Sequence, residues 1–404
     1  MKLKRALWLV ILLHSWIGIQ AQLIPGLKQS HILCGADRTD AYLNLITGKN
    51  IGVVANPTSR VGSVHLVDSL VHSGVRVIKI FAPEHGFRGE GEAGASIRDG
   101  LDPVTTIPVI SLYGNHKKPS PADLTGLDLV IFDIQDVGVR FYTYISTLHL
   151  VMEACATAGK PLLVLDRPNP NGFYIDGPIL DTAYRSFVGM HPVPVVHGMT
   201  IGEYARMING EHWLQDGIQC DLTVIKCAGY DHQTEYILPV KPSPNLPDQV
   251  SVYLYPSLCF FEGSIISIGR GTEFPFQVYG HPAMSGEFRF TPKSLPGISL
   301  HPLYENKACY GRDLRRDGIR EFSQQPGLIL EWLIDAYQKM NRSGGFFTDY
   351  FDTLAGTNQL RIQIQNGRSP EEIRAGWEPG LSKYQEMRSK YLLYEDSELC
   401  LRLK

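Results

Sequence analysis

The stretch Phe81–Glu92 (FAPEHGFRGEGE) combines acidic, basic and imidazole side chains with glycines that allow tight turns. It follows an apolar run, Val75–Phe81 (VRVIKIF), whose length and β-branched residues predict a buried strand. Ligands of open α/β sheets bind beyond the carboxyl ends of the strands, so a polar loop in this place is a candidate site. We therefore take Glu84, His85 and Glu92 as candidate catalytic groups. The alternative is a solvated loop whose charges serve solubility.

Polar side chains also follow other apolar runs that predict strands. The run 127–134 leads into the sequence QDVGVR, and the run 160–165 leads into DRPNPNG. Asp133, inside the end of its strand, is expected to be structural. The remaining candidates in these loops and farther along the chain are Asp136 and Glu262 as catalytic groups, and Arg140, Tyr142, Tyr144, Asp166, Arg167, Asn169, Asn171, Asn245 and Arg270 as substrate-binding groups.

Carboxyl groups beside aromatic rings and amide or guanidinium donors suit glycoside hydrolysis. That reaction needs one protonated carboxyl group for the leaving oxygen, and a second group that activates water or stabilises an oxocarbenium-like centre. For each acid, a structural role such as capping a loop or pairing with an arginine is an equal alternative. His85 is expected to orient a partner by hydrogen bonding, although its imidazole titrates in the range that proton transfer requires.

The elements that must position these groups alternate between strands and helices. Strands are predicted at 50–55, 75–81, 107–113, 127–134 and 160–165, and helices at 61–73 and about 144–158. This alternation predicts an α/β fold with a doubly wound, mostly parallel sheet. Right-handed crossovers place the strand ends on one edge of the sheet, so the polar loops should share one cleft.

The second half of the chain has a different pattern of predicted elements. Thr200 and Glu203 form a capping-box pattern that predicts a helix to about residue 213, and 220–227 alternates like a strand. Lys241–Pro247 (KPSPNLP) is predicted to be extended and rigid because of its three prolines. A strand at 286–290, a helix near 327–340 and a helical tail to about 391 predict a smaller α+β unit. We place the domains at 22–260 and 261–404.

Composition excludes several classes of protein. The 404 residues suffice for two domains, and the net charge of −3 gives no basic field for nucleic acid or anionic lipid. Residues 1–21 have a basic start, an apolar segment and a small residue at the end, which predicts a secretory signal peptide. We therefore expect an exported, periplasmic or extracellular protein without a membrane anchor. The seven cysteines show no zinc-site spacing and are expected mostly as core thiols, with one or two disulfides left open.

Several common active-site motifs are missing from the sequence. There is no GxGxxG or GxxxxGK[ST] in a suitable context, which argues against a nucleotide-binding enzyme, and no GxSxG nucleophile elbow. No cofactor is expected. A metal-dependent hydrolase stays open as an alternative, because Glu84 with His85 and Asp133 with Asp136 offer ligands at a generic spacing.

Long stretches of the chain together resemble one family. They are PEHGFRGEGEAG (83–94), FDIQDVGVRFYTY (132–144), LDRPNPNG (165–172), SFVGMHPVPVVHGMTIGEYA (186–205), LPVKPSPNLP (238–247), YLYPSLCFFEG (253–263) and GRGTEFPFQ (269–277). These stretches are similar to the bacterial exo-β-N-acetylmuramidases of the NamZ type, once known only as a domain of unknown function. The resemblance runs from about residue 40 to the C-terminus.

The resemblance implies a Rossmann-like first domain and a smaller C-terminal domain that closes the cleft. It implies an exo-acting glycosidase that releases N-acetylmuramic acid from the non-reducing end of peptidoglycan fragments, so the expected partners are muramic acid–glucosamine oligosaccharides. By position, Glu84 of the PEHG motif is the expected acid/base or key catalytic carboxylate. The competing candidates for its partner are Asp136, Glu92 and Glu262.

The lactyl carboxylate of N-acetylmuramic acid calls for a cation, and a guanidinium can bind it in a bidentate manner. Arg140, Arg167 and Arg270 are candidates, and we favour Arg270 because its flanking glycines allow close approach. The competing class is a non-catalytic peptidoglycan-binding protein that keeps the cleft. Neither the oligomeric state nor retention or inversion at the anomeric carbon follows from the sequence.

Overall fold

The computed structural model describes residues 23–89, 99–340 and 345–401. The predicted signal peptide and Glu92 lie outside these described residues. We call residues 23–248 the first part and residues 249–401 the second part, each without its undescribed stretch. In the part of the chain that is described, no helix has the length and apolar character needed to cross a membrane.

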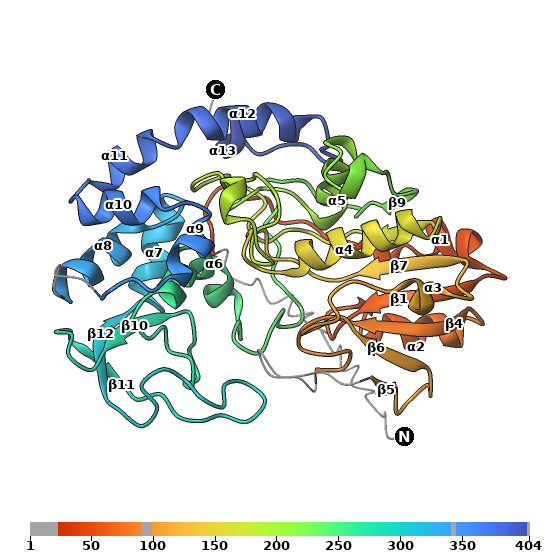
Figure 1. Ribbon diagram of the computed structural model, residues 1–404, viewed down its shortest axis with the longest axis horizontal. Coiled ribbons are helices and arrows are strands. Elements are labelled where there is room, and N and C mark those ends of the chain that lie inside the picture. Colours follow the sequence, from red (N-terminus) through yellow and green to blue (C-terminus); the bar gives the residue numbers. More distant parts are fainter. Residues whose placement is uncertain (1–22, 90–98, 341–344, 402–404) are drawn as a thin grey trace, which may run out of the picture.

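The first part is built on a seven-stranded sheet with the order β5-β6-β4-β1-β7-β8-β9 (Figure 1). Its strands are β1 (Asn50–Ala55), β4 (Arg76–Ala82), β5 (Gly100–Leu101), β6 (Pro108–Ser111), β7 (Leu129–Asp133), β8 (Leu162–Leu165) and β9 (Leu222–Ile225). The pairing is parallel throughout except between β5 and β6, which run antiparallel. This confirms the prediction of a mostly parallel sheet.

Helices cover both faces of this sheet, because successive side chains of a strand point to opposite sides. From β1, Ile51 and Val53 pack with α1 (Thr39–Ile46) and α2 (Leu66–His72), whereas Val54 faces the core that holds α4 (Tyr144–Thr157) and α5 (Ile201–Gly210). A short helix, α3 (Pro121–Leu124), precedes β7. The doubly wound arrangement expected from the sequence is therefore present.

The helix predicted at 61–73 begins only at Leu66. The residues before it form a short antiparallel hairpin of β2 (Arg60–Val61) and β3 (Val64–His65). Gly62, in the turn, has φ 55, a conformation that ends a right-handed helix. The imidazole of His65 then accepts a hydrogen bond of 3.3 Å from the backbone N–H of Val67 and so caps α2.

The second part contains a three-stranded antiparallel sheet with the order β10-β12-β11. Its strands are β10 (Val278–His281), β11 (Phe288–Phe290) and β12 (Cys309–Asp313). Its helices are α6 (Gln249–Leu258), α7 (Asp317–Gln324), α8 (Leu330–Lys339), α9 (Tyr350–Ala355), α10 (Gln359–Gln365), α11 (Pro370–Ala375), α12 (Glu378–Ser389) and α13 (Glu398–Leu401). The predicted strand at 286–290 and helix near 327–340 are confirmed as β11 and α8.

The two parts are joined by a continuous apolar core that takes residues from both. Helix α12 also runs back over the first part, where it lies near α5 (Figure 1). Tyr384 donates a hydrogen bond of 2.7 Å to the carbonyl of His197, and Arg388 Nε donates one of 2.9 Å to the carbonyl of Gly198. Beyond α12, the Tyr394 hydroxyl donates to Asp166 at 2.6 Å. We call residues 378–401 the C-terminal tail.

The cysteines are all within the described residues, where each is buried and none forms a disulfide. Their expected role as core thiols is thereby confirmed, and the disulfides left open by the sequence are not formed.

Candidate active site

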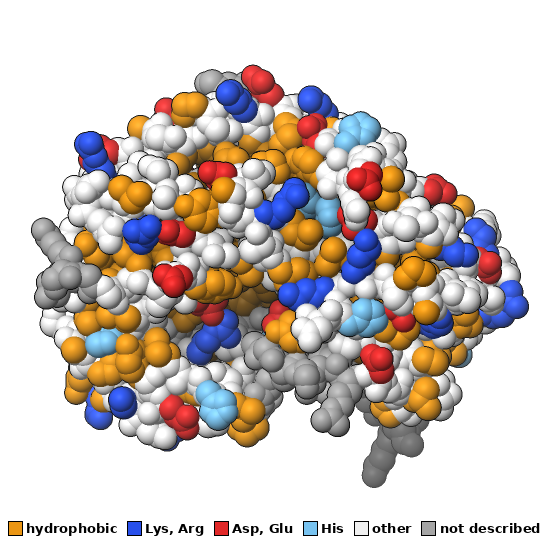
Figure 2. Space-filling view, in the orientation of Figure 1, with side chains coloured by type: hydrophobic (Ala, Val, Ile, Leu, Met, Phe, Trp, Pro, Cys, Tyr) orange, Lys and Arg blue, Asp and Glu red, His pale blue; other side chains and the backbone are white. Residues whose placement is uncertain are grey.

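A cavity of about 360 Å³ lies where the carboxyl edge of the large sheet meets the second part. Figure 2 shows this face of the molecule hollowed between the two parts, with acidic and basic side chains around hydrophobic ones. The volume is near the lower end of the range for small-molecule sites, about 300–1,000 Å³, and suits one sugar unit rather than a chain. The cavity is lined by Glu84, His85, Phe141, Tyr142, Thr143, Tyr144, Val188, Ser243, Asn245, Leu246, Tyr255, Glu262, Arg270, Phe276 and Tyr350.

Glu84 and His85 follow the end of β4, separated from it by Pro83, and so lie beyond the strand as the sequence predicted. His85 has φ 73, a left-handed conformation that is uncommon outside glycine and is found at functional sites. The Glu84 carboxylate accepts a hydrogen bond of 3.4 Å from Thr143 Oγ1 and one from the Tyr113 hydroxyl. Burial, with the Glu84 charge and this hydrogen bond, raises the pKa of Tyr113 to about 12, so its hydroxyl stays a donor. No ion pair to Glu84 forms among the described residues.

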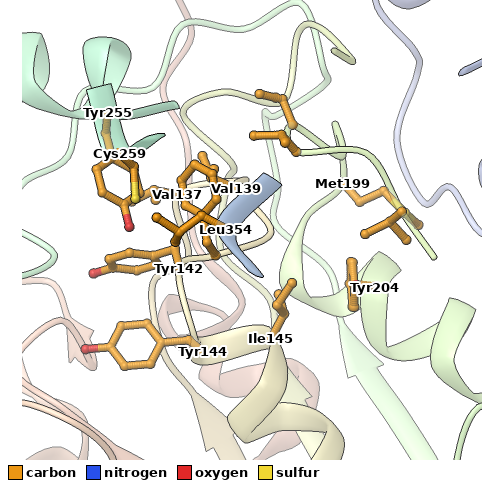
Figure 3. Packing of buried hydrophobic residues seen from close by; sticks show 14 of the residues in the cluster. Val137, Val139, Tyr142, Tyr144, Ile145, Met199, Tyr204, Tyr255, Cys259 and Leu354 are labelled. Atoms are coloured by element: carbon orange, nitrogen blue, oxygen red, sulfur yellow. The ribbon is translucent and has the colours of Figure 1, made fainter. Parts of the chain in front are cut away.

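Three tyrosines form an aromatic wall of the cavity. The ring centroid of Tyr142 lies 5.0 Å from that of Tyr144 and 5.9 Å from that of Tyr255, both in edge-to-face contact. Figure 3 shows the hydroxyl groups of Tyr142 and Tyr144 turned to the same side. Burial raises the pKa of all three hydroxyls well above the ordinary value, so each remains protonated. The wall offers ring faces and hydroxyl groups of the kind that bind sugars.

The proline-rich segment Lys241–Pro247 turns back on itself and is not extended as expected. The backbone N–H of Leu246 donates a hydrogen bond of 3.1 Å to the carbonyl of Ser243, which closes a tight turn. Proline fixes φ near −65°, and that value fits a turn as well as an extended chain. The turn brings Ser243, Asn245 and Leu246 to the cavity, and the Tyr142 hydroxyl donates to the carbonyl of Pro242 at 2.8 Å.

Glu262 and Arg270 enter the cavity as an ion pair. Arg270 Nε lies 2.8 Å and Nη2 lies 2.6 Å from Glu262 Oε1, and the Cys259 thiol contacts Glu262 Oε2 at 3.4 Å. The guanidinium also lies over the ring of Phe276, 5.1 Å from its centroid. Burial acts to lower the pKa of Arg270, but the Glu262 charge and hydrogen bond raise it above the ordinary value. The guanidinium is therefore charged and held in a fixed orientation.

Other predicted site residues lie outside the cavity, which corrects the expectation that all polar loops share one cleft. Asp133 forms a buried ion pair with Arg167 at 2.6 Å, so the structural role expected for Asp133 is confirmed. Asp166, also buried, accepts hydrogen bonds from Thr200 Oγ1 at 2.8 Å and from the backbone N–H of Gly202 at 2.8 Å. These groups are buried in contacts with other parts of the protein and do not line the cavity.

Arg140 is fully buried and binds four backbone carbonyls, in the segments 178–193 and 354–355. Its guanidinium thus ties the second part to the first, and burial lowers its pKa to about 9. Asn169 Nδ2 donates to the carbonyl of Met199 at 2.9 Å, and Asn171 Nδ2 to that of Val137 at 2.9 Å. None of these three side chains lines the cavity.

Asp136 also lies outside the cavity lining. Its Oδ2 accepts a hydrogen bond of 2.6 Å from the backbone N–H of Gly138, and the residue is 3% exposed. Of the competing carboxylates, Glu92 is outside the described residues, and Glu262 lines the cavity bound to Arg270.

The sequence alone missed several cavity residues. Thr143 stands within the motif FDIQDVGVRFYTY and could have been found from its position between two chosen tyrosines. Tyr350 begins α9, far along the chain, and is 43% exposed. No local pattern marks Tyr350, because only the packing of α9 against residues 259–263 brings it to the cavity.

No group of three or more His, Cys, Asp and Glu side chains within residues 23–89, 99–340 and 345–401 is arranged to hold a metal ion. Asp133, one of the ligands that the sequence offered, is instead paired with Arg167.

Comparisons with known proteins cover most of the chain. Residues 51–250 match the family model described as exo-β-N-acetylmuramidase NamZ, N-terminal, and residues 253–394 match the C-terminal model of the same description. The peptidoglycan β-N-acetylmuramidase NamZ of Bacillus subtilis (strain 168) is 39% identical over 375 residues, which cover 87% of this chain and 89% of that protein.

Two crystal structures of DUF1343 family proteins from Bacteroides fragilis have the same fold. One is 46% identical, with a TM-score of 0.84, and the match covers 91% of this chain and 100% of that one. The other is 27% identical, with a TM-score of 0.76, and the match covers 90% and 99%. The chain therefore belongs to the exo-β-N-acetylmuramidase NamZ family.

Proposed function

We propose that this protein is an exo-acting glycosidase that releases N-acetylmuramic acid from the non-reducing end of peptidoglycan fragments. Family membership supports the reaction. The observation that carries the assignment to this cavity is Glu84, a carboxylate without an ion pair among the described residues, at the carboxyl edge of a parallel sheet. The cavity has room for one sugar beside it, which suits removal of a terminal unit.

Glu84 is assigned as the group that donates a proton to the leaving glycosidic oxygen. Thr143 and Tyr113 donate hydrogen bonds to its carboxylate and hold it in place. The tyrosine wall supplies ring faces for the sugar and excludes water from one side of it. His85, next in sequence, is assigned to orient the substrate or Glu84 by hydrogen bonding.

Arg270 is assigned to bind the lactyl carboxylate that distinguishes muramic acid from glucosamine. Its contacts with Glu262 use Nε and Nη2, so the N–H groups of Nη1 can donate to the ligand. In this scheme Glu262 is a positioning residue for Arg270. Glu92 remains a candidate for the second catalytic carboxylate.

Action outside the cytoplasmic membrane is also part of the proposal. It is supported by the signal-peptide pattern of residues 1–21 and by the location of peptidoglycan in the cell envelope. Determination of the N-terminal sequence of the protein from cell-envelope and medium fractions tests it. A protein that keeps residues 1–21 and stays in the cytoplasm would contradict it.

The decisive experiment is product analysis with a chromogenic β-N-acetylmuramide and a muramic acid–glucosamine disaccharide. Wild type is compared with Glu84→Gln, each with and without a chelator. Chelator-resistant release of N-acetylmuramic acid that is lost in the variant supports the metal-free glycosidase. Chelator-sensitive release would favour the metal-dependent hydrolase. A folded protein that binds the disaccharide and releases no sugar would favour the non-catalytic binding protein.

A further inference from the structure

Asn245 lines the cavity with a side chain that is only 3% exposed. Its Nδ2 donates a hydrogen bond of 3.0 Å to the backbone carbonyl of Ile298. A carbonyl oxygen can only accept, so this bond fixes the orientation of the amide and identifies the other atom as Oδ1. Asn245 therefore presents a defined acceptor.

No protein group among the described residues donates a hydrogen bond to this buried Oδ1. A buried acceptor without a donor lowers stability, and native structures leave few of them. The atom belongs to a cavity residue on the closed turn 243–246, so it is held in place before a ligand arrives. These facts call for a ligand with an N–H or O–H donor.

The apolar residues of the cavity lining decide between these two donors. Leu246 and Phe276 are each 1% exposed, and the ring of Phe276 packs edge-to-face on Tyr255 with centroids 4.8 Å apart. A sugar hydroxyl both donates and accepts, and it gains nothing from apolar neighbours. A secondary amide has one N–H, and an acetamido group adds a methyl that apolar side chains can cover.

We propose that Asn245 Oδ1 accepts the N–H of the 2-acetamido group of the bound sugar, with the acetyl methyl against Leu246 and Phe276. This assignment rests on the proposed function and adds the residue that recognises the N-acetyl group. Arg270 and Asn245 then divide the recognition of the substrate, one for the lactyl carboxylate and the other for the amide.

The test measures binding without cleavage. Two ligands are compared by calorimetry: the methyl 1-thio-β-glycoside of N-acetylmuramic acid, and its ester analogue, in which oxygen replaces the 2-NH. The thioglycosides resist hydrolysis, and the ester removes only the donor. Wild type is expected to bind the amide at least about tenfold more tightly, because the ester leaves Oδ1 unpaired.

Two variants separate the acceptor from the shape of the side chain. Asn245→Leu has a similar size and no acceptor, so we expect equal affinity for amide and ester. Asn245→Asp keeps an oxygen acceptor but loses the N–H that donates to Ile298, so we expect it to retain only part of the preference for the amide. Thermal unfolding of each variant without ligand shows that the fold is kept.

The proposal is overturned if Asn245→Leu, folded as wild type, keeps the wild-type preference for the amide. That result would leave the proposed function intact wherever wild type still releases N-acetylmuramic acid from the disaccharide. A wild-type protein that binds neither thioglycoside and releases no sugar would overturn the proposed function and this assignment together.

Discussion

Two loops at the same edge of the large sheet carry nearly the same kinds of side chain. The loop after β4 contains Glu84 and His85, and the loop after β8 contains Asp166, Arg167 and two asparagines. The first opens on the cavity, whereas the second is buried and bonded to other parts of the protein. The residue types alone do not separate the two loops.

The difference lies in what covers each loop. After β8, the Asp166 carboxylate accepts hydrogen bonds from the start of α5 and from Tyr394 of the C-terminal tail. The backbone carbonyl of Asp166 also accepts one of 2.7 Å from the N–H of Gly35. Glu84 after β4 is held by the Thr143 and Tyr113 hydroxyls and keeps capacity for a ligand. A polar loop is thus available for chemistry to the extent that the fold leaves its groups unsatisfied. We call the loop after β4 the open loop and the loop after β8 the covered loop.

The largest expected effect distinguishes the loops by catalytic rate. Glu84→Gln in the open loop should lower kcat by about 10²–10⁴-fold, the usual contribution of a general acid. Its free energy of unfolding should stay within about 0.5 kcal/mol of wild type, because the side chain is half-buried and bears no ion pair among the described residues. Steady-state kinetics and denaturant titration measure the two quantities. A fully active variant would mean that the open loop is not the catalytic one.

Loss of a partner of the covered loop should have the opposite effect, and Asp133 at the end of β7 is such a partner. Asp133→Ala leaves Arg167 as a buried unpaired charge, so we expect the free energy of unfolding to fall by about 3–5 kcal/mol. Activity per folded molecule should stay near wild type. Denaturant titration measures the free energy of unfolding, and titration of the active sites gives the activity per folded molecule.

A double variant, Asp133→Leu with Arg167→Met, is the matched control for that prediction. It removes both charges and should be more stable than the single variant. A single variant that unfolds like wild type but loses kcat would place the covered loop in the catalytic machinery and reverse the comparison.

A smaller effect is expected at Arg270. Arg270→Lys keeps the charge but loses the forked donors, so the preference for muramic acid over glucosamine glycosides should fall by about 10–100-fold. The ratio of kcat/KM for the two chromogenic substrates measures it. Glu262→Gln should raise KM for the muramide with little change in kcat, as befits a positioning residue. An unchanged ratio in Arg270→Lys would move lactyl recognition to another group.

The smallest effect concerns the pH dependence of stability beside the open loop. Hydrogen bonds from Arg88 hold the pKa of Asp102 well below its ordinary value of 3.8. The folded state thus favours the ionised carboxylate, and this stabilisation is complete above the ordinary pKa and is lost as the pH falls below it. Asp102→Asn should be less stable than wild type by about 1–2 kcal/mol at pH 7, with a smaller difference at pH 3. An equal difference in stability between variant and wild type at pH 7 and pH 3 would contradict the stabilisation of ionised Asp102 by Arg88.

Much of the fold follows from the sequence, because hydrophobic period and strand length are local properties. The parallel strands, α4, α5 and α8 were predictable in this way, as was the place of Glu84 after β4. The hairpin at 60–65 was missed because valines at helical spacing also fit two short strands around Gly62. The turn at 241–247 was missed because a proline-rich segment permits both conformations.

The composition of the cavity was only partly predictable for a different physical reason. Arg140 and Asp166 have the chemistry of a binding site, and their burial depends on segments more than two hundred residues away. Tyr350 reaches the cavity through the same kind of distant packing. Sequence patterns give the residue types at a strand end, whereas the partners of those residues are set by tertiary contacts.

The attachment of the C-terminal tail affects the order in which the protein can be completed. Tyr394 is close to the end of a 404-residue chain, yet it donates a hydrogen bond to Asp166 at the edge of the first sheet. The backbone N–H of Leu393 donates in the same way to Glu203 at 2.8 Å. A ribosome synthesises the chain from its N-terminus at about 5–20 residues per second. Asp166 and Glu203 are therefore synthesised tens of seconds before Tyr394 and Leu393. The first part of the protein therefore completes these hydrogen bonds only after the C-terminal tail has been synthesised.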